Sequence, residues 1–151
     1  MKMQNQDKRN GVISFKGYRL FHLQFKCDPK YNQQSIPNGR FMYNFSYGFA
    51  ELPTGDVQVN MLVQAYYGNE EIDAEHSQFS ITVEIGGKFA TANGVKWDHR
   101  WDANAIAILY PYARAIISSI TAQAGVDTVI LPTVNVAAML MNKDAVASDP
   151  E

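Results

Sequence analysis

The sequence lacks features that several protein classes need. Cys27 is its only cysteine among 151 residues, so no internal disulfide can form. The first residues contain no apolar core of a signal peptide. No stretch approaches the roughly 18 consecutive apolar residues typical of a membrane span. We therefore expect a cytoplasmic protein that does not insert into a membrane.

Motifs of catalysis and of metal binding are also missing. There is no Gly-x-Ser-x-Gly, and Cys27 and the nearby His22 alternate to opposite faces of a predicted strand. The three histidines lack the spacing of metal ligands. The sequence thus predicts no enzyme, no cofactor and no metal site.

Charge is unevenly distributed along the chain. The net charge is −2, yet residues 1–30 hold seven Lys or Arg against two Asp. A basic arm of this kind could bind nucleic acid. It contains no dense basic run with interleaved aromatic residues, so we interpret it as a solvated N-terminus and expect no nucleic-acid partner. Length and composition predict one domain over 1–151, with flexible tails at 1–13 and 143–151.

Four segments alternate apolar and polar residues with period two, the pattern of half-buried strands. They cover residues 21–27, 41–49, 57–65 and 79–85, and turn-forming residues separate them. We expect an antiparallel sheet with one apolar face, which includes Phe21 and Leu23. Gly86-Gly87 predicts a bulge or bend, after which Phe89 returns to the apolar side.

The period then changes to that of an amphipathic helix. Apolar residues recur at intervals of three and four from Ile106 to Ala124, and Gly125 stands where a C-terminal cap belongs. Pro111 places the start of the regular helix near itself. A short second helix is predicted from Val136 to about Asn142. The fold class is therefore α+β: a four-stranded antiparallel sheet followed by a long and a short C-terminal helix.

The second strand carries an aromatic residue at every other position: Phe41, Tyr43, Phe45, Tyr47 and Phe49. We call these five residues the aromatic ladder. One helix is narrow beside four strands, so part of their apolar face is left without cover. Exposed apolar patches of a few hundred Å² usually mark interfaces or binding grooves. The pattern predicts self-association, an apolar groove, or both; an aromatic pocket for one small ligand is a further alternative.

An acidic cluster precedes the fourth strand and consists of Glu70, Glu71, Asp73 and Glu75. Most such clusters are solvated hairpin tips, and a minority dock basic partners. We retain both interpretations.

The C-terminal third of the sequence resembles the SecB family of export chaperones. The segments that carry the resemblance are Leu109-Tyr110-Pro111-Tyr112-Ala113-Arg114, Ile117-Ser118-Ser119, Gly125, Leu131-Pro132 and Val134-Asn135. Phe79, Gly86-Gly87 and Phe89 fall at the family's spacing upstream. The likeness covers roughly residues 15–142 and is specific from about residue 79.

The resemblance implies an ATP-independent holdase that binds unfolded or precursor polypeptides. It implies a homotetramer, a dimer of dimers, with long helices between two eight-stranded sheets. Carried over by position, the client groove includes Phe79, Val136 and Leu140. To these we add Met139, which is on the same short predicted helix. We also add Phe41 and Tyr43, because they lie on the apolar face at the start of the aromatic ladder.

The family's export members dock on the SecA motor through acidic residues of the exposed sheet face and through a C-terminal tail. The matching positions of the first strand here are His22 and Lys26, and that of the fourth is Thr82, with Glu84 out of step. Glu84 and the acidic cluster are the candidate docking residues. The departures count against SecA and favour, as an alternative, a dedicated chaperone for one client such as an antitoxin.

Overall fold

The computed structural model describes residues 13–92 and 95–133. Its elements are β1 (Ile13–Cys27), η1 (Gln33–Ser35), β2 (Arg40–Glu51), β3 (Val57–Gly68), β4 (Phe79–Thr91), η2 (His99–Trp101) and α2 (Asp102–Gln123). The four strands and the long helix confirm the predicted fold class. The predicted short helix lies outside the described residues, as do residues 1–12 and 143–151 of the predicted tails.

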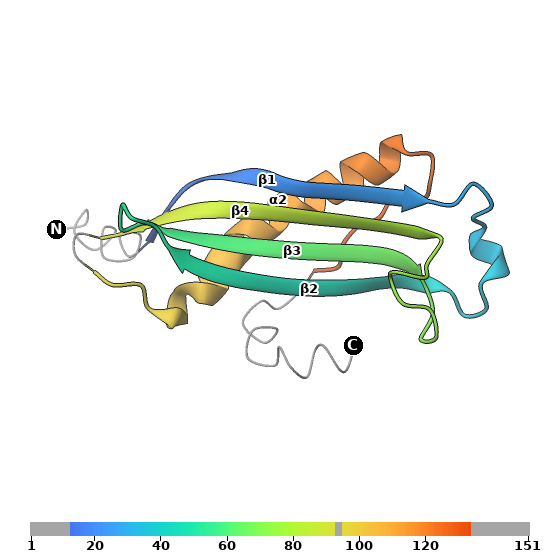
Figure 1. Ribbon diagram of the computed structural model, residues 1–151, viewed down its shortest axis with the longest axis horizontal. Helices are drawn as coiled ribbons and strands as arrows, with labels where there is room; N and C mark the ends of the chain where they lie inside the picture. Colours follow the sequence, from blue (N-terminus) through green and yellow to red (C-terminus); the bar gives the residue numbers. More distant parts are fainter. Residues whose placement is uncertain (1–12, 93–94, 134–151) are drawn as a thin grey trace.

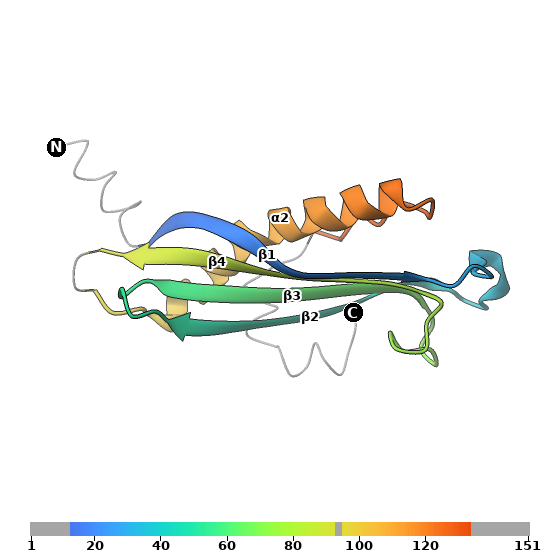
Figure 2. The same cartoon turned by 45° about the horizontal axis from the view of Figure 1, so that its top comes forward.

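The strands form one sheet in the order β1-β4-β3-β2, with every neighbouring pair antiparallel. Helix α2 crosses one face of this sheet diagonally, from near the end of β2 to past the outer edge of β1 (Figure 1). Figure 2 shows the two layers from another angle, with α2 behind the strands. The sheet therefore has a helix face and an outer face, and no described helix or strand covers the outer one.

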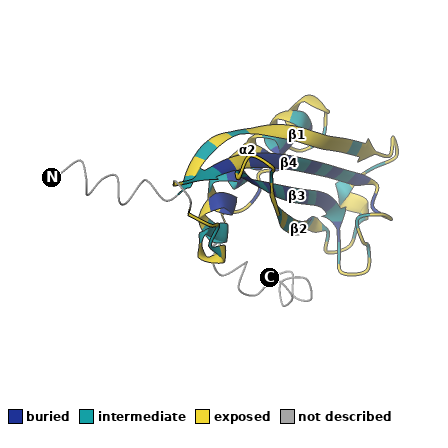
Figure 3. Cartoon of the chain, turned by 60° about the vertical axis from the view of Figure 1, so that its left-hand side comes forward, coloured by how far each residue is buried: buried dark blue, intermediate teal, exposed yellow. Residues whose placement is uncertain are grey.

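The core lies between α2 and the two central strands. Alternate residues of β3 and β4 are buried, and those between them are mostly half-buried (Figure 3). From α2 the core receives Ala105, Ile106, Leu109, Ala113, Ile117 and Thr121. Their spacing of three and four is the period that the sequence predicts for the helix.

Strand β1 departs from simple alternation. Its register against β4 shifts between Phe15 and Tyr18 and again between Leu20 and His22. The second shift puts Phe21 over Gly86, on the outer face, whereas Leu23 pairs with Val83 on the helix face. The prediction that Phe21 and Leu23 share a face was wrong, because an irregularity of one residue reverses the facing of everything beyond it.

The predicted bulge at Gly86-Gly87 is not in β4 itself. The pairing of β4 with β3 runs regularly through both glycines, and the irregularities lie opposite, in β1. Gly87 serves another purpose: a Cβ there would stand 2.5 Å from a methyl carbon of Leu109. The missing side chain lets α2 approach the sheet closely. Phe89 is buried on the helix face, as predicted.

Helix α2 begins at Asp102, nine residues before the start predicted from Pro111. A proline inside a helix leaves the carbonyl four residues earlier without its partner. Both Pro111 and Ala107 are exposed here, so water can satisfy that carbonyl. At its start the helix is held by Asp102, which accepts hydrogen bonds from Trp97 Nε1 at 2.8 Å and shares one with His99 Nδ1 at 3.2 Å.

The helix ends where the sequence predicts. Gly125 has a φ of +83°, which terminates the helix and lets the chain reverse. Residues 126–133, here called the return segment, then run back along α2. Thr121 Oγ1 accepts a hydrogen bond from the Val129 N–H at 2.9 Å, and Ser118 Oγ donates to the Val129 carbonyl at 2.9 Å. Tyr110 donates to the Pro132 carbonyl at 2.6 Å.

By length and composition the stretch His99–Gln123 could cross a membrane. No membrane span is expected from the sequence, because no stretch approaches roughly 18 consecutive apolar residues. Core helices of water-soluble proteins meet the same length and composition test. One stripe of this helix packs on β4 and β3, with a smaller contact on β1.

Candidate functional site

The aromatic ladder lies on the helix face of β2, an edge strand. Its five residues pair across to Tyr67, Ala65, Val63, Met61 and Val59 of β3. The β3 partners are buried, except Tyr67, whereas all five ladder residues are only half-buried. The reason is the diagonal path of α2, which covers β4 and β3 and does not follow β2 (Figure 1). The ladder is therefore apolar surface that the chain itself covers only in part.

At the start of β2 the ladder joins an aromatic cluster that we call the Phe41 cluster. Its members are Phe25, Tyr31, Phe41, Tyr67 and Phe79. The Phe41 ring centroid lies 5.2 Å from that of Tyr67 and 6.0 Å from that of Phe79. Phe79 is 1% exposed, and Tyr31 stacks on it at 5.5 Å. In this arrangement Phe79 is the floor of the cluster, and Phe41 and Tyr31 are its surface.

Two phenols beside this surface are held in an apolar environment. Burial raises the pKa of Tyr31 to about 12, although the neighbouring Gln33 side chain acts to lower it. The Tyr31 hydroxyl is buried with no partner of good hydrogen-bond geometry among the described residues. Burial also raises the pKa of Tyr110 to about 12, although the charge of Arg114 acts to lower it.

Tyr110 of α2 holds Pro132 of the return segment by its hydrogen bond. Tyr43 of the ladder and Tyr110 both pack against the core beneath this part of α2. Of the predicted groove residues, Phe41, Tyr43 and Phe79 are brought to this region. Val136, Met139 and Leu140 lie outside the described residues.

The opposite end of the ladder packs against rings from outside the sheet. Phe49 contacts Trp97 at 6.0 Å and the His99 ring at 6.2 Å. Trp97 also meets Phe89 and Trp101. The contact of these tryptophans with the ladder was not predicted, because no local sequence pattern reports contacts between residues so far apart in the chain.

The candidate docking residues fall into two places. Glu70, Glu71, Asp73 and Glu75 lie between β3 and β4, whereas Glu84 lies on the outer face opposite His22. Arg40 pairs with Glu70 at 3.4 Å. A hydrogen bond with His76 at 2.7 Å lowers the pKa of Asp73 and raises that of the imidazole. Within the described part of the chain, no three Asp, Glu, His or Cys side chains gather as a metal site would require.

The family model described as preprotein translocase subunit SecB matches residues 28–147. The chain belongs to the SecB family. An uncharacterized protein of Methanocaldococcus jannaschii, MJ0357, is 39% identical over 82 residues. That match covers 53% of each protein, so the chain spans about half the length of the curated relative it matches.

Among solved structures, the fold resembles the SecB-like chaperone Rv1957 of Mycobacterium tuberculosis. That protein was solved in complex with a ChAD peptide from the Rv1956 HigA1 antitoxin. The TM-score is 0.63 at 14% sequence identity, and the match covers 82% of this chain and 91% of the other. At this identity the likeness establishes the SecB-like fold.

Proposed function

We propose that this SecB-family chain is an ATP-independent holdase, which binds exposed apolar segments of unfolded or precursor polypeptides in the cytoplasm. The half-buried aromatic ladder is the observation that carries the proposal. A client segment would lie between the start of β2 and the wall made by α2 and the return segment. Burying apolar side chains there would remove both surfaces from water.

The chemistry of this surface suits clients of many sequences. Aromatic rings supply large contact areas and accept apolar side chains of different shape. Binding would proceed by mass action, because a protein that binds only the unfolded chain holds it until it dissociates. Phe41 and Tyr43 would form the wall of the groove, and Phe79, itself buried, would support Phe41 from beneath. Val136, Met139 and Leu140 are proposed as its further wall.

We propose a homotetramer, built as a dimer of dimers, as the working form. The outer edge of β1 is not paired within the described residues, and Leu20 and Leu23 of this strand are exposed. An unpaired edge with apolar side chains is a surface on which a second sheet can extend. Sedimentation velocity of the full chain measures the native mass.

The test of the proposed function is aggregation of a chemically unfolded, slow-folding protein on dilution, with this protein added in stoichiometric amount and without ATP. We expect suppression. The variant Phe41→Ser/Tyr43→Ser should lose most of it, whereas Phe21→Ser/Tyr112→Ser, the same change at exposed rings outside the groove, should keep it. A folded protein that does not suppress aggregation would contradict a general holdase.

The short helix is tested separately. Leu140→Asp should abolish client binding and leave the far-ultraviolet circular dichroism and the native mass unchanged. Loss of the oligomer in this variant would instead assign Leu140 to the subunit interface.

A dedicated chaperone for one client is the second candidate. The resembling mycobacterial protein carries a peptide of an antitoxin, and the outer face here has His22 and Lys26 where docking on SecA would require acids. The discriminating measurement is binding of purified SecA to the full chain. This candidate predicts no complex, and a SecA complex of micromolar affinity would favour an export role instead.

A further inference from the structure

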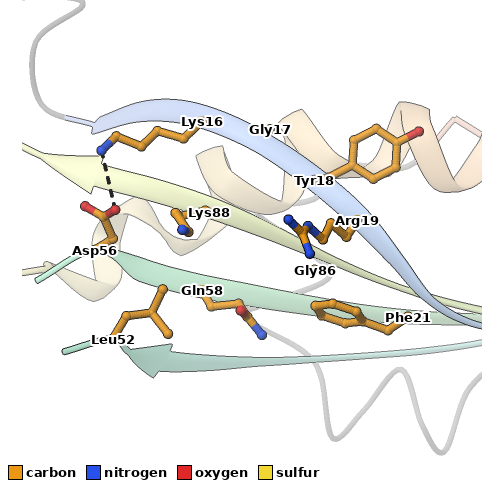
Figure 4. A pocket seen from close by; sticks show the side chains of 10 residues that line it. All are labelled: Lys16, Gly17, Tyr18, Arg19, Phe21, Leu52, Asp56, Gln58, Gly86 and Lys88. Atoms are coloured by element: carbon orange, nitrogen blue, oxygen red, sulfur yellow. Dashed lines mark hydrogen bonds and ion pairs between the residues drawn. The ribbon is translucent and has the colours of Figure 1, made fainter. Parts of the chain in front are cut away.

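A hollow of about 570 Å³ lies on the outer face, on the side of the sheet away from α2 and the aromatic ladder. It is bounded by the first half of β1, the turn between β2 and β3, and the second half of β4 (Figure 4). The lining residues are Lys16, Gly17, Tyr18, Arg19, Phe21, Leu52, Asp56, Gln58, Gly86 and Lys88.

The hollow exists because of two local features. Strand β1 has its two register shifts here. Gly17, which lies within the first shift, has a φ of +107°, and the strand bends away from β4 (Figure 2). Gly86 provides the floor. A Cβ at this position would collide with the Phe21 ring and would stand 2.8 Å from Asn60 Oδ1. Any side chain at Gly86 would therefore fill the space over which Phe21 lies.

Positive charge gathers around this hollow. Three cations line it, and Asp56 is its single acid, paired with Lys16 at 3.4 Å. Arg19 and Lys88 make no hydrogen bond or ion pair through their side chains with any described residue. The chain as a whole carries a net charge of −2, so this excess of positive charge is local.

An exposed apolar group stands beside the unpaired cations. Phe21 is 49% exposed, and Leu52 lies across the hollow from it (Figure 4). The phenyl ring, the Arg19 guanidinium and the Lys88 ammonium group line the same hollow (Figure 4), which therefore offers two kinds of contact: an apolar surface, and donors that suit carboxylates.

We propose that this hollow docks an acidic segment of a partner polypeptide. In such a segment carboxylates on both sides of an apolar residue would pair with Arg19 and Lys88, and the apolar side chain would rest on Phe21 and Leu52. The complementary charge selects an acidic partner. The open outer face favours a polypeptide over a small molecule, because small-molecule sites enclose most of the ligand surface.

The experiment measures fluorescence anisotropy of a labelled twelve-residue peptide, with four Glu flanking a Phe and a Leu, on titration with the full chain. Arg19→Glu/Lys88→Glu should weaken binding about tenfold, because two exposed attractions become repulsions. The matched control Lys30→Glu/Lys96→Glu makes the same charge change at exposed lysines outside the hollow and should change affinity less than twofold. The same peptide with Gln in place of Glu should also bind about tenfold more weakly.

Several outcomes would overturn the proposal. Equal weakening by the control variant would assign binding to diffuse charge, and unchanged affinity in Arg19→Glu/Lys88→Glu would move it to another surface. Displacement of the peptide by inorganic phosphate at an equal concentration would assign the hollow to small anions. Loss of self-association in that same variant would mean that the hollow binds the acidic cluster of a second copy of the chain and not a different partner.

If Arg19→Glu/Lys88→Glu does not fold, the neutral variant Arg19→Gln/Lys88→Gln replaces it. Its affinity for the acidic peptide should be about threefold lower than that of the wild-type chain. Aggregation suppression by either variant should match that of the wild-type chain, since the hollow and the aromatic ladder lie on opposite faces. The proposal is therefore independent of the holdase function.

Discussion

The two ends of the aromatic ladder share one strand, one face and one repeating pattern, yet they have different surroundings. At the Phe49 end, Trp97 and the start of α2 lie over the rings. At the Phe41 end, α2 has diverged toward β1, and the rings rest on Tyr67 and Phe79 of their own sheet. The rings at both ends are half-buried and pack against the core, one end beside Trp97 and the other against rings of its own sheet. The second end is the one proposed above as the client wall.

This difference shows that similar residues on one strand can acquire different neighbours from the elements packed above them. A helix that followed β2 would have met all five rings. Because α2 runs diagonally, the half-buried rings pack against different elements at the two ends of the strand. The following predictions separate the two ends, beginning with the largest effect.

Phe79→Ala should lower the free energy of unfolding by about 3–5 kcal/mol, because a fully buried ring is removed from beneath Tyr31 and Phe41. Urea denaturation measures the loss. Phe41→Ala, half-buried above it, should cost about 1–2 kcal/mol. Equal costs for the two variants would show that Phe41 is also part of the core and is not a surface wall.

Trp97→Ala should cost about 3 kcal/mol, since it removes ring contacts with Phe49 and Phe89 and the hydrogen bond to Asp102. Aggregation suppression per folded molecule should stay unchanged, because this end is not the one proposed as the client wall. A variant that remains folded and loses suppression would extend the client groove along the whole ladder.

Two tyrosines at the open end should respond in opposite directions to the same change. Tyr110→Phe removes the 2.6 Å hydrogen bond to Pro132 and should destabilise the fold by about 1 kcal/mol. Tyr31→Phe removes a buried hydroxyl without a well-placed partner among the described residues and should leave stability unchanged or raise it by up to about 1 kcal/mol. Thermal or urea unfolding of both variants measures these changes. A clear loss of stability in Tyr31→Phe would mean that the Tyr31 hydroxyl does make a hydrogen bond in the folded protein.

The smallest effect concerns pH. Tyr31 and Tyr110 have a pKa of about 12 in the fold against an ordinary value of 10.0. The unfolded chain therefore loses these protons first, and their contribution to stability is complete below pH 10 and declines between pH 10 and 12. The urea concentration at the unfolding midpoint should change little between pH 8 and pH 10 on account of these two tyrosines. It should decrease clearly between pH 10 and pH 11. The fall should shrink in Tyr31→Phe/Tyr110→Phe, and an equal fall in that variant would place its cause elsewhere.

Much of this fold was predictable because the spacing of apolar residues shows directly which side chains share one face of a strand or helix. The ladder, the alternation of β3 and β4, and the stripe of α2 follow from spacing alone. The face on which Phe21 lies could not be predicted from spacing, because a bulge depends on the partner strand as well as on local residues. The early start of α2 was missed because the cost of Pro111 depends on whether Ala107 faces water. Phe41, Tyr43 and Phe79 were predicted for the groove, whereas the burial of Phe79 beneath Tyr31 required the tertiary contacts.

The two adjacent glycines of β4 have a consequence for how the two faces can change. Gly87 admits Leu109 of α2 on one face, and Gly86 admits Phe21 on the other. Insertion or deletion of a single residue ahead of this pair would exchange their facing, so that the helix and the phenyl ring would each meet a side chain. Length changes in the preceding part of β4 are thus constrained from both sides of the sheet at once. Variation in chain length should instead accumulate in the turns, where it does not change which residues lie on each face of the sheet.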